Sequence, residues 1–392
     1  MTVRIALFAT AALMSTTLGA TPIPGLAPDS PWTLDGYLSY MATATLPDNH
    51  NSLLDHLVHH RLNVEYRFSH QLKIKVGMRN RLLAGDSNDL PGFSDTVGND
   101  NGYWDLSGNW IDNDTLIATT SLDRLYLDWH NDLWQVQGGR FRINWGMTTV
   151  WNPNDLFNSY SIYDVDYPER PGSDAVQLSR KLGFASEWNL VYNPSSEASL
   201  DSYAGRYLSN AHGWDWQLLL AKSRRDRVVG AGIAGDIGGA GVRGEISWLN
   251  PIDEQWQGQP QTATSVGSLE ADFNFAGKRN WSLKGALLHL SNPQPVDSGA
   301  DYLGQPLTVR SLSFTEWTGY LESGVDLSPL WRLTLSASYY QDHSYFLGAS
   351  SSYSLADNCT LQAIVQRFDG GGGALFADTP ATLIYGLVRW NF

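Results

Sequence analysis

The sequence predicts an all-β fold, a transmembrane antiparallel up-and-down β-barrel of about 18 strands, with a range of roughly 14–18. Three observations carry this prediction. Apolar and polar residues alternate with a period of two along most of the 392 residues, as expected for strands with two different faces. Short turns alternate with longer loops between the candidate strands. The chain has 16 Trp and 18 Tyr residues, and such aromatics form belts at membrane interfaces.

The chain divides into a leader and one domain. Residues 1–20 have the pattern of a secretory signal, because Arg4 precedes an apolar run that ends in small residues. We expect cleavage after Ala20, a Pro-rich periplasmic lead over 21–31 and the barrel over 32–392. Beyond the signal, no apolar run reaches the roughly 20 residues of a membrane helix. Alternating strands do not raise the mean hydropathy, which is −0.27.

The strand at 56–68 illustrates the alternation. Leu62, Val64 and Tyr66 share one face, whereas Arg61 and Glu65 share the other. The strand at 71–84 and the strand at 331–344 repeat this scheme. The full set of predicted strands is 32–45, 56–68, 71–84, 115–129, 131–142, 173–182, 184–194, 198–208, 213–223, 226–236, 239–249, 265–276, 279–291, 312–326, 331–344, 350–356, 359–369 and 380–392.

The connections predict how the barrel is oriented. Long ones cover 85–114, 143–172, 250–264, 292–311 and 370–379, whereas the alternate connections are short. Long extracellular loops and short periplasmic turns are typical of outer-membrane barrels. An even strand count places both ends of the barrel on the periplasmic side. The last strand would then close against the first, with Trp390 and Phe392 at the periplasmic interface.

Two soluble β folds are the alternatives. A propeller would show repeats of roughly 40–50 residues, and the sequence has none. A sandwich would bury one face of each strand, but the polar faces here carry many Arg, Lys, Glu and Asp residues that suit a watery lumen better than solvent.

Composition excludes several functional classes. The chain carries 26 Lys and Arg against 40 Asp and Glu, a net charge of −14, which argues against a nucleic-acid partner. The single Cys359 rules out an internal disulfide and a cysteine-based metal cluster. We expect no cofactor and no metal site.

The mature chain resembles a Gram-negative outer-membrane β-barrel of the porin type. The resemblance rests on the signal, the alternation, the loop asymmetry and the terminal sequence from Trp390 to Phe392. It implies outer-membrane lipid and the barrel-assembly machinery as partners, with Trp390 and Phe392 as the assembly signal, and it allows a homotrimer. Residues 139–158 and 166–180 are similar to a segment of poorly characterised outer-membrane barrels. A count of 18 strands is similar to that of substrate-specific porins and the alginate exporter.

A barrel of this width would leave an aqueous channel, so we expect passive diffusion of small polar solutes. Basic residues at inward positions would form a positive sector of the lumen and attract anions or acidic sugars. Alternatively, they would pair with lumen acids such as Glu65 and Asp128 and only stiffen the wall. These predicted pore-lining residues are Arg61, Arg67, Lys73, Lys75, Arg79, Arg81, Arg140, Arg142 and Arg389.

The connection at 143–172 is the predicted constriction. It is rich in aromatic and acidic residues, and a loop of this length is usually functional or disordered. Its aromatic content argues against disorder, so we expect it to fold into the lumen, with its acids facing the basic sector. An ordered external loop is the alternative. The residues expected at the constriction are Trp145, Trp151, Asp155, Tyr163, Asp164, Asp166, Glu169 and Arg170.

Other functions have weaker support. The loop at 85–114 holds many Asp residues but fits no complete calcium-loop pattern. No G-x-S-x-G motif is present, and His56, His59 and His60 do not define a catalytic site. We therefore do not expect an enzyme. A barrel enzyme with a site at the rim, and a structural or surface-anchoring barrel without transport, remain the alternatives.

Overall fold

A computed structural model describes residues 30–256 and 259–392. The predicted signal at 1–20 and most of the lead at 21–31 lie outside the described residues. No helix in the described part of the chain is long and apolar enough to cross a membrane.

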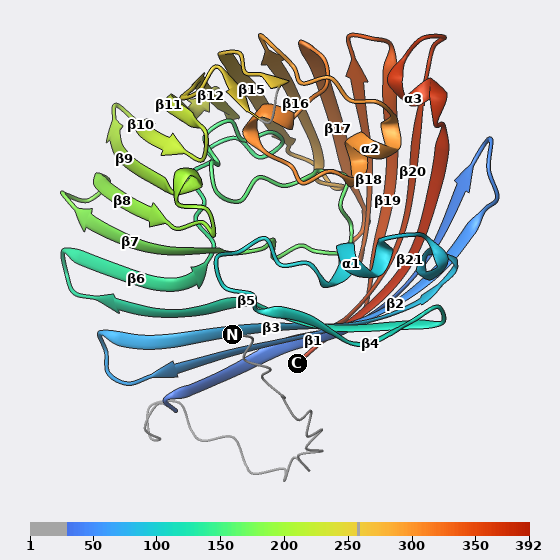
Figure 1. The fold of residues 1–392 in the computed structure, drawn as a ribbon, viewed down its shortest axis with the longest axis horizontal. Helices are drawn as coiled ribbons and strands as arrows, with labels where there is room; N and C mark the ends of the chain where they lie inside the picture. The colour runs from blue at the N-terminus through green and yellow to red at the C-terminus, as the bar shows by residue number, and fades with distance from the viewer. Residues whose placement is uncertain (1–29, 257–258) are drawn as a thin grey trace.

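Eighteen antiparallel strands form a closed wall (Figure 1). The first nine are β1 (Trp32–Pro47), β2 (Leu53–Arg67), β3 (Leu72–Gly85), β5 (Leu116–His130), β6 (Trp134–Phe141), β7 (Ser173–Lys181), β8 (Glu187–Asn193), β9 (Ser202–Ala211) and β10 (Trp214–Ser223). The others are β11 (Asp226–Ile237), β12 (Ala240–Pro251), β15 (Thr264–Phe275), β16 (Trp281–Leu290), β17 (Trp317–Ser328), β18 (Trp331–Tyr340), β19 (Ser344–Ala356), β20 (Cys359–Gly370) and β21 (Ala381–Asn391).

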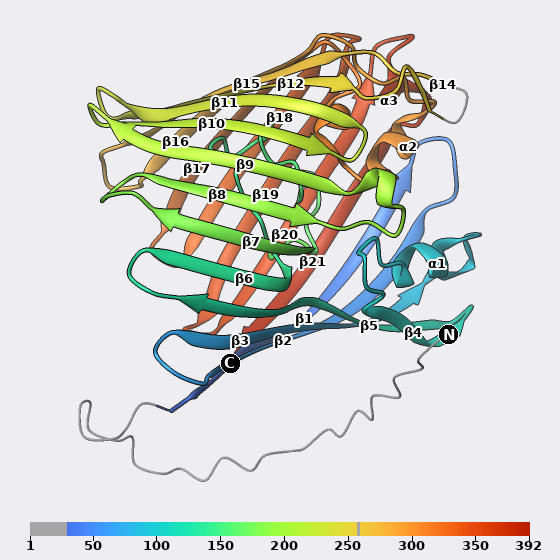
Figure 2. The ribbon, with the colours of Figure 1, turned by 60° about the vertical axis from the view of Figure 1, so that its left-hand side comes forward.

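Each strand pairs with its neighbours in chain order, and the barrel closes where β21 pairs with β1. Phe392 completes this seam, because its backbone N–H and C=O bond to the C=O and N–H of Gly36 at 3.0 and 3.1 Å. The predicted fold and its 18 wall strands are confirmed. The strands run side by side and tilted around the wall (Figure 2), as closure of a barrel requires.

The connections at one end of the barrel, here the turn end, are short, and the longer ones all lie at the opposite loop end. Several loops carry structure that the sequence did not predict. The connection after β3 holds η1 (Asp86–Asp89), α1 (Phe93–Gly98) and β4 (Ser107–Asn113), and β4 pairs with β5. The remaining short elements are η2 (Ala198–Leu200), β13 (Gln255–Trp256), β14 (Gln259–Pro260), α2 (Gly299–Gly304), η3 (Val309–Ser311) and α3 (Leu375–Asp378).

The two faces of each strand differ as the alternation predicts. On β10, Leu218 and Leu220 point outward and are 62% and 65% exposed, whereas Gln217 and Leu219 point inward and are 2% and 1% exposed. Trp32 packs on Tyr66 at the turn end, with ring centroids 4.3 Å apart. These features give the wall an apolar outer band with aromatic residues at its borders, as in barrels that span a bilayer.

The wall has one irregularity that matters for its interior. The pairing of β3 with β5 shifts between Gly77, which pairs with Arg124, and Met78, which pairs with Leu122. Asp123 is therefore the extra residue of a β-bulge, which breaks the alternation of side chains. As a result, Asp123 and Arg124 both contact residues inside the barrel.

Candidate functional site

The long connection between β6 and β7, residues 142–172, runs through the interior of the barrel (Figure 1). We call it the inner loop. Its position agrees with the fold expected for 143–172, and four groups of contacts attach it to different parts of the wall.

The first attachment uses two carboxylates that the sequence reading did not single out. Glu245 on β12 accepts the backbone N–H groups of Thr148 and Asn154 at 2.9 and 3.0 Å, and also that of Met147. Glu270 on β15 accepts those of Thr149 and Val150 at 2.7 and 3.0 Å. The wall thus supplies acceptors for backbone donors that would otherwise be buried without partners.

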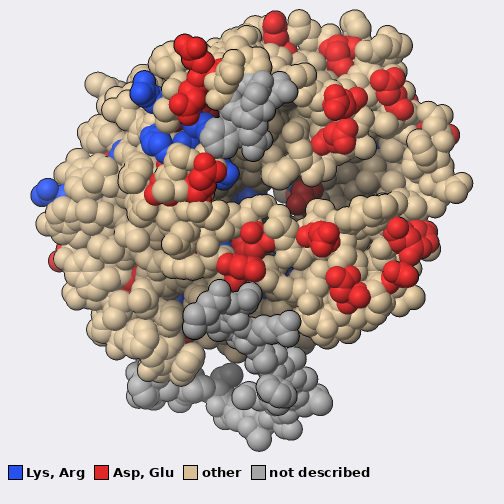
Figure 3. Space-filling view, viewed as in Figure 1, with Lys and Arg blue, Asp and Glu red and all other residues tan. Residues whose placement is uncertain are grey.

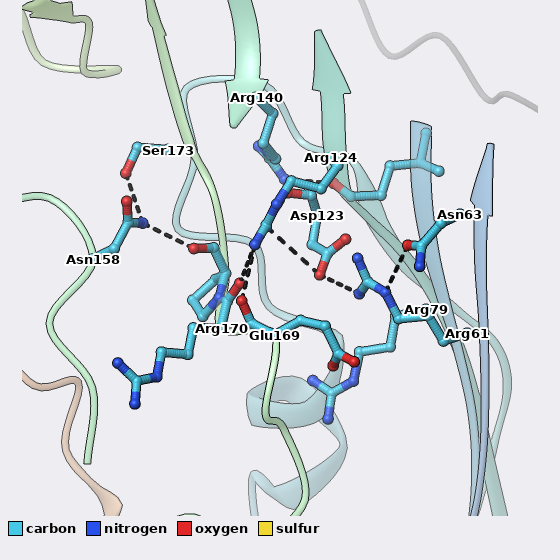
Figure 4. Close-up of polar contacts among 12 residues, drawn as sticks. Arg61, Asn63, Arg79, Asp123, Arg124, Arg140, Asn158, Glu169, Arg170 and Ser173 are labelled. Carbon is cyan, nitrogen blue, oxygen red and sulfur yellow. Dashed lines mark hydrogen bonds and ion pairs between the residues drawn. The ribbon is translucent and has the colours of Figure 1, made fainter. Parts of the chain in front are cut away.

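The second attachment uses the β5 bulge (Figure 4). Arg124 donates to the carbonyl oxygens of Glu169 and Arg170 at 2.9 and 2.7 Å. Asp123, beside it, accepts from Arg61 at 2.5 Å. Arg61 is only 2% exposed, so this ion pair is a buried part of the wall. Arg124 was absent from the predicted basic set, because a bulge has no clear sequence signal here.

The third attachment joins loop acids to the predicted basic sector. Asp166 forms an ion pair with Arg79 and contacts Nδ1 of His59 at 3.2 Å. Glu169 accepts from the hydroxyl of Tyr37 at 3.0 Å. The guanidinium of Arg79 also lies 3.9 Å from the ring centroid of Tyr167. The loop acids therefore face the basic wall, as the sequence suggested, but Asp166 and Arg79 neutralise each other.

The fourth attachment is aromatic. Tyr163 is buried among Tyr340, Phe346 and Phe368, and its hydroxyl bonds to Ser338 at 3.1 Å. Trp151 lies in a separate cluster with Val150 and inward residues of β10 to β16. Trp145 packs edge-on against Phe157, with centroids 5.5 Å apart. These aromatic side chains hold the loop in place by burying apolar surface.

Burial and charge shift the pKa values of the loop acids in opposite directions. Complete burial raises the pKa of Asp155 to about 6, although its carboxylate accepts the backbone N–H of Asn158 at 3.1 Å. Burial also raises the pKa of Asp164. Burial alone would raise the pKa of Asp166, but the contact with His59 and the charge of Arg79 lower it to about 2.

The predicted basic residues fall into two groups. Arg67, Lys73 and Lys75 all pair with Glu65 near the turn end, at 2.8, 3.6 and 3.0 Å. Arg61 and Arg79 are paired as described above. In contrast, Arg81, Arg142 and Arg389 form no ion pair with another described residue, and Nε of each has no hydrogen-bond partner there. Arg81 donates to the carbonyl of Val97 at 2.7 Å, and Arg389 lies over the ring of Tyr37.

Arg140 lies on a different face from the one expected. It pairs in register with Leu125 and Asp174, at positions that alternate with the inward Gln135 and Gln137. Its guanidinium binds Asp174 at 2.7 Å, Asp100 at 2.6 Å and the carbonyl of Trp104 at 2.6 Å. Arg140 thus links β6 and β7 to the loop that precedes β4. The same contacts occupy Asp100, one of the acids considered for calcium.

Arg170, the last predicted constriction residue, lies over the ring of Tyr160, 2.6 Å from its centroid. On the face of the molecule shown in Figure 3, acidic side chains lie on several sides of the central hollow, and a group of basic side chains lies at its upper left.

No family model matches the sequence, and no curated protein is similar to it in sequence. Solved structures are similar in fold. OprD from Pseudomonas aeruginosa is 9% identical, with a TM-score of 0.57 over 93% of this chain and 94% of that one. OccK5 from the same species is 8% identical, with 0.57 over 92% and 98%. OccAB1 from Acinetobacter baumannii is 8% identical, with 0.59 over 92% and 96%.

At these identities the similarity concerns the fold. The chain is a closed 18-strand antiparallel barrel like those of OprD and the Occ proteins. The predicted class of fold is confirmed at that level, and the outer-membrane location stays a prediction. The similarity does not identify a solute.

Proposed function

We propose that the protein is an outer-membrane channel for passive diffusion of small polar solutes, with small anions or acidic sugars as the preferred class. The similarity in fold to OprD and Occ channels supports a channel rather than a barrel enzyme or an anchor. The inner loop narrows the lumen and sets its selectivity, as proposed for 143–172.

One observation carries the preference for anions. Arg81, Arg142 and Arg389 are partly buried inside the barrel and have no ion-pair partner among the described residues. In contrast, Arg61, Arg67, Arg79 and Arg124 each have a carboxylate beside them. A guanidinium without a carboxylate is ready to bind one from a solute, since its planar donors match carboxylate geometry. The acidic side chains around the central hollow oppose this preference. The net ion selectivity therefore depends on whether these acids or the three arginines lie closer to the constriction.

Single-channel conductance in a planar bilayer, with a salt gradient to read ion selectivity, tests the proposal. We expect stable steps with anion preference. Replacing Arg81, Arg142 and Arg389 together by Gln should move the reversal potential toward cations. Arg67→Gln is the matched control, because Arg67 is already paired with Glu65 near the turn end, and it should leave the potential nearly unchanged.

Each outcome has a separate meaning. Stable steps with cation preference would keep the channel and reject the anion class. Absence of conductance from a protein shown to be folded and inserted would overturn the channel. In that case the rim enzyme and the surface anchor would become the leading functions.

A further inference from the structure

A hairpin at the loop end of the wall concentrates positive charge in a chain whose net charge is −14. Residues 222–227, where β10 turns into β11, read Lys-Ser-Arg-Arg-Asp-Arg, so four of the 26 Lys and Arg residues lie within six positions. Figure 3 shows basic side chains gathered over this part of the loop end. The charge of this hairpin is therefore opposite to that of the chain as a whole.

Three of these cations lie on the outer face of the wall. Lys222 follows Leu220 along the outward face of β10, and Arg227 precedes Val229 along that of β11. Leu220 and Val229 are 65% and 50% exposed. Lys222 and Arg227 are opposite each other in register, and Arg224 is exposed in the turn between them. We call Lys222, Arg224 and Arg227 the outer cation group.

The group lies where the apolar band ends. Tyr203 on β9 pairs in register with Lys222 and stacks on Tyr192 of β8, with ring centroids 5.0 Å apart. Exposed aromatic side chains of this kind mark the level of the lipid head groups in membrane barrels. Long Lys and Arg side chains can cover apolar surface with their stems and place their charge at the same level.

The acids next to the hairpin are engaged elsewhere. Asp226, on the inward face of β11, is bound by Arg310 at 2.8 and 2.6 Å. Asp201 accepts the hydroxyl of Tyr192 at 3.0 Å. Glu197 accepts the hydroxyl of Ser199 at 2.5 Å. These bonds leave the outer cation group without a carboxylate of its own.

The cations themselves have few partners. The ammonium group of Lys222 donates to the backbone carbonyls of Ser199 and Asp201, which carry no charge. Arg224 and Arg227 form no ion pair within residues 30–256 and 259–392. Like charges opposite each other on two strands destabilise the pairing. An anion bound between them would therefore stabilise this hairpin.

The turn geometry does not explain the arginine at its first position. Arg224 has a φ of 51°, and positions of this kind in two-residue hairpin turns favour Gly, Asn or Asp. The next hairpin turns along the chain on either side have Gly213 and Gly238 at positive φ. Arginine is strained in this conformation. A residue kept in such a conformation motivates a functional hypothesis, and what arginine adds here is its charge.

We propose that the outer cation group binds the phosphate of an anionic lipid in the membrane leaflet at the loop end. Guanidinium groups bind phosphate through two parallel hydrogen bonds, and a lysine adds a point charge. Leu220 and Val229 lie directly beside the group on the apolar band, where they would contact the acyl chains that a free phosphate lacks. The inference rests on the proposed membrane location but not on the solute, and it gives lipid contact a defined head group and site.

The experiment measures lipid binding by the folded full chain in mild detergent, with native mass spectrometry to count bound lipids. Phosphatidic acid should bind more tightly than phosphatidylcholine, whose head group has no net charge. Replacing Lys222, Arg224 and Arg227 together by Gln should weaken binding of phosphatidic acid about 100-fold and leave that of phosphatidylcholine unchanged. Heat-modifiable migration on gels shows that each variant is folded.

Arg367→Gln is the matched control. Arg367 pairs in register with the exposed Leu347, so it lies on the outer face, and it is also near the loop end. It is already paired with Asp48 and Asp369 at 2.7 and 2.6 Å. This variant should bind phosphatidic acid as the wild type does.

Arg224→Gly separates lipid binding from folding. Glycine relieves the positive φ, so the variant should unfold at the same or a higher urea concentration, while its affinity for phosphatidic acid falls about fivefold. Inorganic phosphate at the same concentration as the lipid should not displace it, because phosphate has no acyl chains.

Four results would each overturn the inference: equal binding of the two lipids, full binding by the triple variant, full binding by Arg224→Gly, or displacement by equimolar inorganic phosphate, which would indicate a site for the free ion. Any of these in a barrel that still conducts would leave the proposed channel standing. A folded barrel that binds phosphatidic acid as expected but never conducts would support the lipid site and overturn the channel.

Discussion

The carboxylate of Glu270 on β15 accepts the backbone N–H of Val150, in the middle of the inner loop, at 3.0 Å. Glu245, on the neighbouring β12, does the same for Asn154 at 3.0 Å. Both glutamates are at most 5% exposed. The wall therefore holds the loop from the side opposite to the basic sector, mainly through bonds to loop backbone N–H groups, with the Thr149 hydroxyl as a further donor to Glu270 at 2.8 Å.

The first prediction concerns these two glutamates. Glu245→Gln and Glu270→Gln each replace one accepting carboxylate oxygen by a donating amide group, and each lost hydrogen bond costs about 1–3 kcal/mol. The inner loop should become less firmly held, so current noise and brief conductance changes should increase in single-channel records. Glu322→Gln is the control, because Glu322 bonds to Tyr320 at 2.7 Å. Equal noise in all three proteins would contradict the anchoring role.

The second prediction concerns acid. The pKa of Asp166 is lowered to about 2 from its ordinary value of 3.8, so its ionised form stabilises the folded loop. This stabilisation is complete above about pH 4 and is lost as the pH falls toward 2. Loop fluctuations should therefore rise steeply over that window. Asp166→Asn should show the same loop fluctuations, seen as current noise in single-channel records, already at pH 7. An Asp166→Asn channel with no more noise than the wild type at pH 7 would rule out Asp166 as the anchor.

The third prediction has the opposite sign. Burial raises the pKa of Asp155 to about 6 from 3.8, so its ionisation costs stability, fully above pH 6 and hardly at all below pH 4. Asp155→Asn keeps the oxygen that accepts from Asn158 and removes the charge. At pH 7 it should stabilise the barrel by about 2 kcal/mol in urea unfolding. The gain should shrink at pH 4.5, and a gain independent of pH would contradict the assigned cause.

Alternation was enough to predict the wall, because a lipid-facing and a watery face select different residues at every second position. The loop that enters the barrel could also be predicted, since Trp151 and Tyr163 are too apolar for an exposed loop. The wall residues that anchor this loop could not be predicted. Glu245 and Glu270 look like ordinary lumen acids in sequence, and the bulge that turns Arg124 inward leaves no signal in the pattern.

Arg140 shows where the same reasoning fails. An arginine on the outer face of a barrel is costly next to lipid, so the sequence reading assigned Arg140 to the lumen. The structure covers it instead with the segment that contains Asp100 and Trp104. This segment comes from a connection about 40 residues earlier in the chain, and no local pattern indicates that it folds back over β6.

The last prediction distinguishes an arginine that stabilises the fold, Arg140, from an arginine proposed to line the path of the solute, Arg81. Arg140→Gln leaves the carboxylates of Asp174 and Asp100, which are 0% and 8% exposed, without their cation. Loss of one partner from a buried pair costs about 3–5 kcal/mol, so the variant should unfold at lower urea and migrate as unfolded at a lower temperature. Adding Asp174→Asn removes one unpaired charge and should recover part of this loss.

In Arg140→Gln, the ion selectivity should stay unchanged although the stability of the barrel falls. Folded Arg140→Gln channels should keep the wild-type reversal potential, because Arg140 is enclosed by the wall and the covering loop. Arg81→Gln should do the reverse, with a small change in stability and a shift toward cations. A shift for Arg140→Gln as large as that for Arg81→Gln would mean that solutes reach Arg140, and the covering loop would then have to open in the membrane.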